Sequence, residues 1–121
     1  PIPMYAAKEV GGADSGPRPM EMILAALGGC SGIDVVHILG NMRIPFESFE
    51  IRLHGVRRDE HPRSFTAIEL EYVFRGAGLE AKRSRLEEAV RLSQEKYCSV
   101  AGMLNQAAQL TYRVTIEETS A

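Results

Sequence analysis

Hydrophobic residues recur along this chain with two different periods, one of them helical. Residues 19–40 form a nearly continuous apolar stretch, in which Glu21 and Asp34 are the only charged residues. A helix that is apolar on all sides is normally buried, and a proline such as Pro19 suits the first helical turn, where its missing N–H needs no partner. The pattern therefore predicts a buried central helix that begins at Pro19.

Three glycines interrupt this helix at positions 28, 29 and 32. Each costs about 1 kcal/mol of helix propensity relative to alanine. The close approach of another backbone would compensate for this cost, and we expect a crossing helix there.

The second period is the alternation typical of strands with one buried face. It covers residues 49–54, 68–75 and 110–117, and a further short strand is predicted at residues 2–7. Turn-forming residues at 59–64 indicate that the strands on either side form an antiparallel hairpin. From Glu80 to Tyr97, apolar residues at spacings of three and four predict an amphipathic helix, and Ser99 is expected to cap a short helix over residues 100–107.

The predicted element order is therefore β-α-β-β-α-α-β, an α+β fold. A length of 121 residues suits a single domain over residues 1–121. A start at Pro1-Ile2-Pro3 predicts either that an earlier strand is missing or that a partner chain covers the first one.

Composition excludes several classes of protein. The chain is 45% hydrophobic and 25% charged, with 14 basic and 16 acidic residues, so we expect a globular protein that does not bind nucleic acid. Its longest apolar run, residues 22–33, is shorter than the roughly 20 residues that span a bilayer, which predicts no membrane insertion. Residues 1–121 contain no charged segment followed by an apolar stretch and a small-residue cleavage site at their start, so nothing in them predicts secretion. We therefore expect a cytoplasmic protein whose two cysteines are reduced thiols.

Cys30 shares one face of the predicted central helix with Asp34 and His37. These residues are compatible with a reactive thiol, with a metal site, or with a buried cysteine whose polar neighbours are satisfied by the sheet or a second subunit. No fourth ligand stands at a recognisable spacing, so we predict no metal.

Cys98 lies next to the N-terminus of the short helix. The helix dipole and free N–H groups there would lower its pKa and favour a nucleophilic thiolate, although simple packing of a helix end is the alternative. The two cysteines lie on different helices, and only the tertiary fold could bring them within the Cα separation of roughly 4.4 to 6.8 Å that a disulfide requires.

Two stretches resemble motifs of the OsmC family, which includes osmotically inducible protein C and the organic hydroperoxide resistance proteins. Residues 19–36, PMEMILAALGGCSGIDVV, are similar to the central helix of that family, and residues 92–100, LSQEKYCSV, are similar to its second cysteine motif. The likeness extends over nearly the whole chain. It implies an OsmC-like fold in which antiparallel sheets pack on the central helices of an intertwined homodimer, with active sites at the subunit interface.

The resemblance also implies an antioxidant, stress-response enzyme: a thiol-dependent peroxidase that reduces organic hydroperoxides. Cys30 would attack the peroxide and become a sulfenic acid, and Cys98 would resolve it as a disulfide. A thiol or dithiol reductant would then restore both thiols. No cofactor is implied.

The chain departs from the better-characterised members at two positions. Those members place an acidic residue ten positions before the first cysteine, where this chain has Met20, while Glu21 points away from the thiol on a straight helix. They also use an early-strand arginine, for which Arg18 is the candidate here. The departures indicate a separate branch of the family. Two other functions stay open: a binding module for a small hydrophobic or acyl ligand, and a redox-sensing dimer.

Overall fold

The structure, a computed structural model, describes Met4, Gly12 and residues 16–120 of the chain. In order, its elements are α1 (Pro19–Asn41), β1 (Ser48–Arg57), β2 (Phe65–Gly76), the 3-10 turn η2 (Glu80–Lys82), α2 (Arg83–Leu92), the π-helical turn η3 (Ser93–Tyr97), α3 (Ser99–Leu104) and β3 (Gln109–Glu118). Over the described residues, the predicted helices and strands are present in the predicted order. The strand expected at residues 2–7 lies outside them, apart from Met4.

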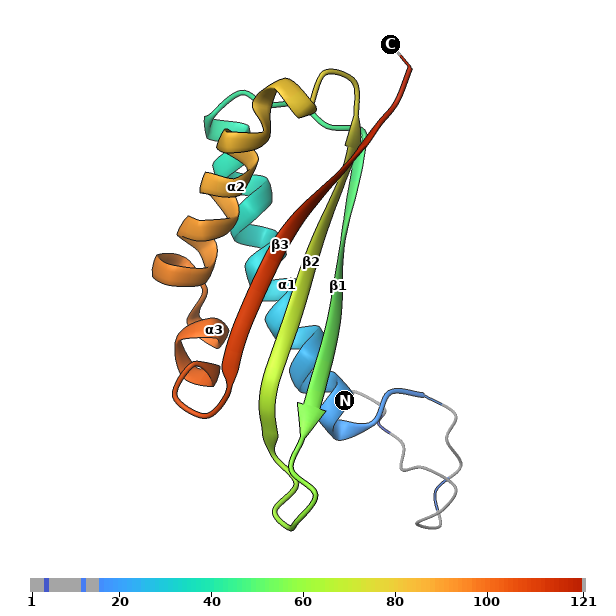
Figure 1. Ribbon diagram of the computed structural model, residues 1–121, viewed down its shortest axis with the longest axis vertical. Helices are drawn as coiled ribbons and strands as arrows, with labels where there is room; N and C mark the ends of the chain where they lie inside the picture. The colour runs from blue at the N-terminus through green and yellow to red at the C-terminus, as the bar shows by residue number, and fades with distance from the viewer. Residues whose placement is uncertain (1–3, 5–11, 13–15, 121) are drawn as a thin grey trace.

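The three strands form one sheet in the order β1-β2-β3, and the helices lie against one of its faces (Figure 1). β1 and β2 form the predicted antiparallel hairpin. β2 and β3 are parallel, so the expectation of an antiparallel sheet is wrong for this pair. The reason is the connection, because a long crossover through helices brings the next strand back in the same direction.

The hydrophobic core lies between this sheet and the helices. Most of its fully buried side chains come from α1, β2 and α2, and include Leu27, Tyr72, Phe74 and Leu86. β2 supplies most of them because it is the central strand, with a neighbour on each side. The core therefore fixes α1 and α2 relative to the middle of the sheet.

Only one side of α1 is buried, so the prediction of a helix buried all round is wrong for a single chain. Ile33 and Val36, on the other side, are 74% and 47% exposed. The buried residues follow helical spacing and are Leu27, Gly28, Ser31, Val35 and Leu39. By length and composition alone, α1 is long and apolar enough to cross a membrane, which the estimate of a dozen apolar residues did not anticipate. Here its buried side packs in the core.

Two of the α1 glycines, Gly28 and Gly32, face strand β1 rather than the expected crossing helix. A Cβ at Gly28 would lie 2.9 Å from Leu53 Cδ1, and one at Gly32 would lie 3.5 Å from Ile51 Cδ1. A Cβ at Gly29 would meet nothing within 4 Å. Gly28 thus lets α1 approach β1 more closely than a larger residue would, Gly32 has room for a Cβ in ordinary van der Waals contact, and Gly29 opens onto the exposed side.

Candidate active site

The two cysteines come from separate parts of the helical layer. Cys30 is half-buried near the middle of α1. Cys98 is 4% exposed and leaves the helical conformation, with ψ of 108°, between η3 and α3. Its N–H donates to the Ser93 carbonyl oxygen at 2.7 Å, a bond that spans five residues and closes the π turn. The π turn therefore determines the direction in which the Cys98 side chain leaves the backbone.

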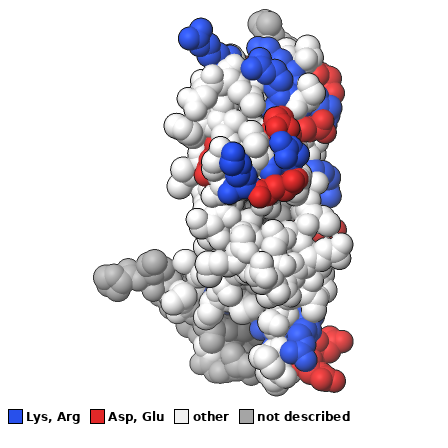
Figure 2. All heavy atoms as spheres, turned by 90° about the vertical axis from the view of Figure 1, so that its left-hand side faces the viewer, with Lys and Arg blue, Asp and Glu red and all other residues white. Residues whose placement is uncertain are grey.

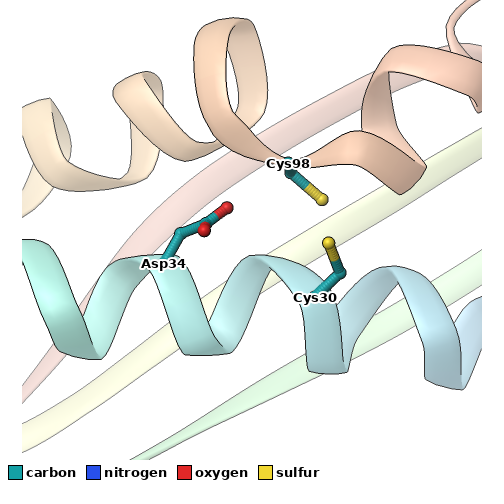
Figure 3. Close-up of side chains that lie close together, drawn as sticks. All are labelled: Cys30, Asp34 and Cys98. Carbon is teal, nitrogen blue, oxygen red and sulfur yellow. The ribbon is translucent and has the colours of Figure 1, made fainter.

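The fold brings these cysteines together. The Sγ atoms of Cys30 and Cys98 and a carboxylate oxygen of Asp34 all lie within 4.8 Å of one another (Figure 3). Both cysteines are free thiols. A disulfide has an S–S distance of about 2.05 Å, so a modest side-chain movement would bring the sulfurs into bonding range. The structure thus answers a question that the sequence left open.

A chain of buried hydroxyl groups lies against the cysteine cluster. Ser31 Oγ lies 2.6 Å from Tyr72 Oη and 2.8 Å from Ser93 Oγ. Ser93 Oγ donates to Asp34 Oδ2 at 3.1 Å, and Gln94 Nε2 donates to Tyr72 Oη at 2.6 Å. Ser31, Ser93 and Tyr72 are fully buried. This network holds Asp34 in place and ties α1 to β2 and η3.

Sequence reasoning missed the network. Ser31 and Ser93 stand at apolar positions of otherwise apolar helix faces, and a polar residue in such a position normally has a buried partner. That signal predicts that each serine forms a buried hydrogen bond, but it does not identify the hydrogen-bond partner, which comes from a distant part of the chain.

Burial controls the charge of Cys98. It raises the pKa of the Cys98 thiol to about 11, an effect that the hydrogen bond from the Ala101 N–H opposes and the neighbouring Cys30 thiol increases. Sγ accepts that bond at 3.4 Å, which makes Cys98, and not Ser99, the N-cap of α3. The prediction of a lowered pKa is therefore wrong, because the backbone N–H groups of Val100 and Ala101 at the start of a short helix do not offset the loss of solvation.

Comparison with known proteins is consistent with this arrangement. The sequence matches the family model described as OsmC-like protein over residues 12–113. The chain belongs to the OsmC family. It is 48% identical over 99 residues to protein YhfA of Escherichia coli strain K12, an alignment that covers 82% of this chain and 72% of that protein.

Solved structures share the OsmC fold of this chain. A hypothetical protein from Aquifex aeolicus is 38% identical, with a TM-score of 0.74, over 89% of this chain and 83% of its own. The organic hydroperoxide resistance protein OsmC from Legionella pneumophila is 15% identical, with a TM-score of 0.70, over 92% and 78% of the two chains. At that identity, the Legionella protein shows a common fold only.

The other predicted site residues of this OsmC-family chain lie outside the cluster. Arg18 precedes the first turn of α1, about 18 Å along the helix axis from Cys30 at 1.5 Å per residue. Its side chain cannot span that distance, so a contact with the thiolate would have to be made in a neighbouring copy of the chain, and this role stays a prediction. His37 lies one turn beyond Asp34 and contacts Asn41, with 3.4 Å between Nε2 and Nδ2.

An open groove begins at the edge of the cluster. It has a volume of about 360 Å³ and is lined by Asp34, His37, Ile38, Asn41 and Tyr97. Tyr97 is 52% exposed. The groove offers an aromatic ring, an aliphatic side chain and polar groups to a small organic molecule beside the thiols.

Proposed function

We propose that this protein is a thiol-dependent peroxidase that reduces organic hydroperoxides. The observation that carries the proposal is the pair of free thiols, which lie within 4.8 Å of each other although they belong to different elements. Two thiols at that distance can pass from the reduced state to a disulfide without unfolding. The fold that this chain shares with the organic hydroperoxide resistance protein of Legionella is compatible with the same chemistry.

Exposure separates the roles of the two cysteines. Cys30 is half-buried and can meet a substrate, whereas Cys98 is 4% exposed, with its pKa raised by burial to about 11. In the proposed reaction the Cys30 thiolate attacks the terminal peroxide oxygen, and the O–O bond breaks. The electron pair leaves on the alkoxide, which takes up a proton to become an alcohol, and Cys30 becomes a sulfenic acid.

Cys98 then resolves this sulfenic acid. The Cys98 thiol gives up its proton and its sulfur attacks Cys30 Sγ, so that an S–S bond forms and water leaves. Asp34 lies within 4.8 Å of both sulfurs and would accept the proton through one water or after a small side-chain movement. An external thiol or dithiol would reduce the disulfide by exchange. The groove beside Asp34 would hold the organic part of the hydroperoxide.

The exposed side of α1 supports the proposal that the protein works as a homodimer. Ile33 and Val36 are exposed there, with Tyr97 and Met103 on the neighbouring elements at 52% and 73% exposure. Viewed toward the helices, Lys, Arg, Asp and Glu are gathered in the upper part and at the lower edge, with a broad uncharged area between (Figure 2). A second copy of the chain would cover this apolar surface, because a symmetric dimer packs the same surface of both chains together.

A charge on this surface tests the homodimer. Ile33→Glu should convert the protein to monomers in light scattering, because an exposed apolar contact becomes a buried carboxylate. Val56→Glu is the control, since Val56 is likewise an exposed aliphatic residue, at 47% against 74% for Ile33, but lies on β1. Equal masses for wild type and Ile33→Glu would count against an interface at this surface.

The enzymatic proposal is tested by mass spectrometry of the reduced protein after addition of one equivalent of cumene hydroperoxide. We expect both thiols to disappear into a Cys30–Cys98 disulfide that peptide mapping locates. Cys98→Ser should stop at a sulfenic acid on Cys30, and Cys30→Ser should consume no peroxide. Two intact thiols after prolonged exposure would contradict the peroxidase and favour a binding module or a sensor. The cytoplasmic location stays a prediction.

A further inference from the structure

The cysteine cluster contains a third donor group that bears a negative charge. Asp34 is half-buried, and its carboxylate lies within 4.8 Å of both sulfurs. It accepts a hydrogen bond from Ser93 Oγ, but within residues 16–120 it forms no ion pair with a Lys, Arg or His side chain. If both thiols ionised, three negative charges would gather in this small volume, which favours a bound cation.

We propose that Cys30, Cys98 and Asp34 form a binding site for a divalent metal ion of the Zn²⁺ type when the thiols are reduced. Two soft thiolates and one carboxylate are ligands that Zn²⁺ accepts, whereas Mg²⁺ and Ca²⁺ prefer oxygen alone. Three protein ligands leave a fourth tetrahedral position for water or another small ligand.

The distances are compatible with such a site. In a tetrahedral complex with Zn–S bonds of about 2.3 Å, the two sulfurs lie about 3.8 Å apart. The donor atoms here already lie within 4.8 Å of one another, so the two sulfurs would need to close by no more than about 1 Å. The two cysteines belong to α1 and to the junction of η3 and α3, and their side chains point toward each other (Figure 3).

The buried hydroxyl network would orient the third ligand. Ser93 is fully buried and donates to Asp34 Oδ2, and Ser93 is itself hydrogen-bonded to Ser31. Ligating carboxylates are usually held in this way by a hydrogen bond from a neighbouring group, which fixes the direction of their free electron pairs. The carboxylate therefore does not have to be ordered by the ion.

Metal binding and disulfide formation would exclude each other, because both use the same sulfur electron pairs. This consequence rests on the proposed peroxidase function, but the site itself does not. When a hydroperoxide oxidises the metal-bound pair, the two thiolates supply two electrons and the solvent supplies two protons. The products are the disulfide, an alcohol, water and the free metal ion. The ion would thus protect the thiols until peroxide releases it.

The site is tested without peroxide, by titrating the reduced, chelator-treated protein with Co²⁺ under nitrogen. We expect one Co²⁺ per chain and a thiolate-to-cobalt charge-transfer absorption, with Zn²⁺ displacing the Co²⁺. Asp34→Asn should weaken Co²⁺ binding by at least about tenfold. Cys98→Ser should remove about half of the charge-transfer absorption or abolish binding.

Asp59→Asn is the matched control, because Asp59 is exposed in the turn after β1. Absence of the charge-transfer band at excess Co²⁺ would overturn the site. Equal affinities of Asp34→Asn and Asp59→Asn would overturn the role of Asp34. Wild-type protein gives a test that needs no variant, since Zn²⁺ should protect both cysteines from alkylation and unprotected thiols would contradict the proposal.

A second arm separates this proposal from the peroxidase. One equivalent of cumene hydroperoxide is added to Zn²⁺-loaded wild type, and released Zn²⁺ is followed with a chromogenic chelator. Slower loss of thiols than in metal-free protein, with release of one Zn²⁺ per disulfide, would support both proposals. If the protein binds Zn²⁺ but peroxide oxidises its thiols neither with nor without Zn²⁺, the peroxidase proposal is refuted and the metal-site proposal is retained.

Discussion

Removal of a single buried hydroxyl group, in Tyr72→Phe, tests the network beside the cysteines. Tyr72 Oη accepts from Gln94 Nε2 and bonds Ser31 Oγ, each at 2.6 Å. Phenylalanine fills nearly the same space, so packing is kept and only the hydrogen bonds are lost. Ser31 keeps its bond to Ser93, whereas the Gln94 amide, 5% exposed, loses this acceptor. A buried polar group that loses its partner costs about 1 to 3 kcal/mol, so we expect a loss of about 2 kcal/mol in the free energy of unfolding.

The assay is urea unfolding followed by circular dichroism. All variants are compared at one chain concentration, because association with a second copy would add to the apparent stability. Tyr112→Phe is the matched control: its hydroxyl donates to Glu95 Oε2 at 2.8 Å, but the residue is 37% exposed, so water can replace the bond. We expect a loss below about 1 kcal/mol there. If both variants unfold at the same urea concentration, the network does not stabilise the fold.

Three further changes have defined outcomes. Gly55→Ala should lower the free energy of unfolding, measured by urea titration, by about 1 to 3 kcal/mol. The new Cβ would lie 2.7 Å from Phe65 Cδ1 and nearer still to Cε1. Gly102→Ala is the control and should not lower the stability, because its Cβ would meet nothing within 4 Å. Burial is the main reason why the pKa of Cys98 is raised from 9.0 to about 11, so the folded state favours the neutral thiol. The contribution of this thiol to stability is therefore complete below pH 9 and is lost as the pH rises to about 11. Cys98→Ala should flatten that decline, and an unchanged pH profile would contradict the assignment. Arg18→Ala should slow thiol oxidation by hydroperoxide in stopped-flow measurements, and an unchanged rate would remove Arg18 from the site.

Most of the secondary structure could be predicted from the sequence because it depends on local periodicity. The apolar run that begins at Pro19 gave the position of α1, and alternation gave the positions of β1, β2 and β3. The direction of β3 could not be found in this way. Alternating residues look the same in a parallel and in an antiparallel strand, and the direction depends on how the helices between Gly76 and Gln109 cross the sheet.

The two cysteines of the candidate site could be singled out from the sequence, but their environment could not. Cys30 and Cys98 were recognisable from their motifs, and the structure brings them together. Asp34 was singled out with His37 by helical spacing, yet only Asp34 joins the cluster. The sign of the pKa shift of Cys98 was also missed, because burial by distant elements outweighs the local effect of a helix end.

The burial of α1 was overestimated for a physical reason. The composition of a helix shows that its surface is apolar and favours burial. It does not show whether the same chain or another copy covers that surface. Here the sheet covers the side that carries Leu27 and Val35, while Ile33 and Val36 stay exposed. The error in the prediction thus marks the surface where a second chain is expected.

Because of the π turn at Ser93–Tyr97, the proximity of the two cysteines depends on the number of residues in this segment as well as on their type. A turn closed over five residues contains one residue more than a regular helical turn, and one residue corresponds to about 100° of rotation around the helix axis. A chain with one residue deleted there could continue α2 as an ordinary helix with its core face intact. The Cys98 side chain would then turn away from α1. A relative in which this segment is one residue shorter would therefore keep the second cysteine in its sequence, but that cysteine would not face the first one.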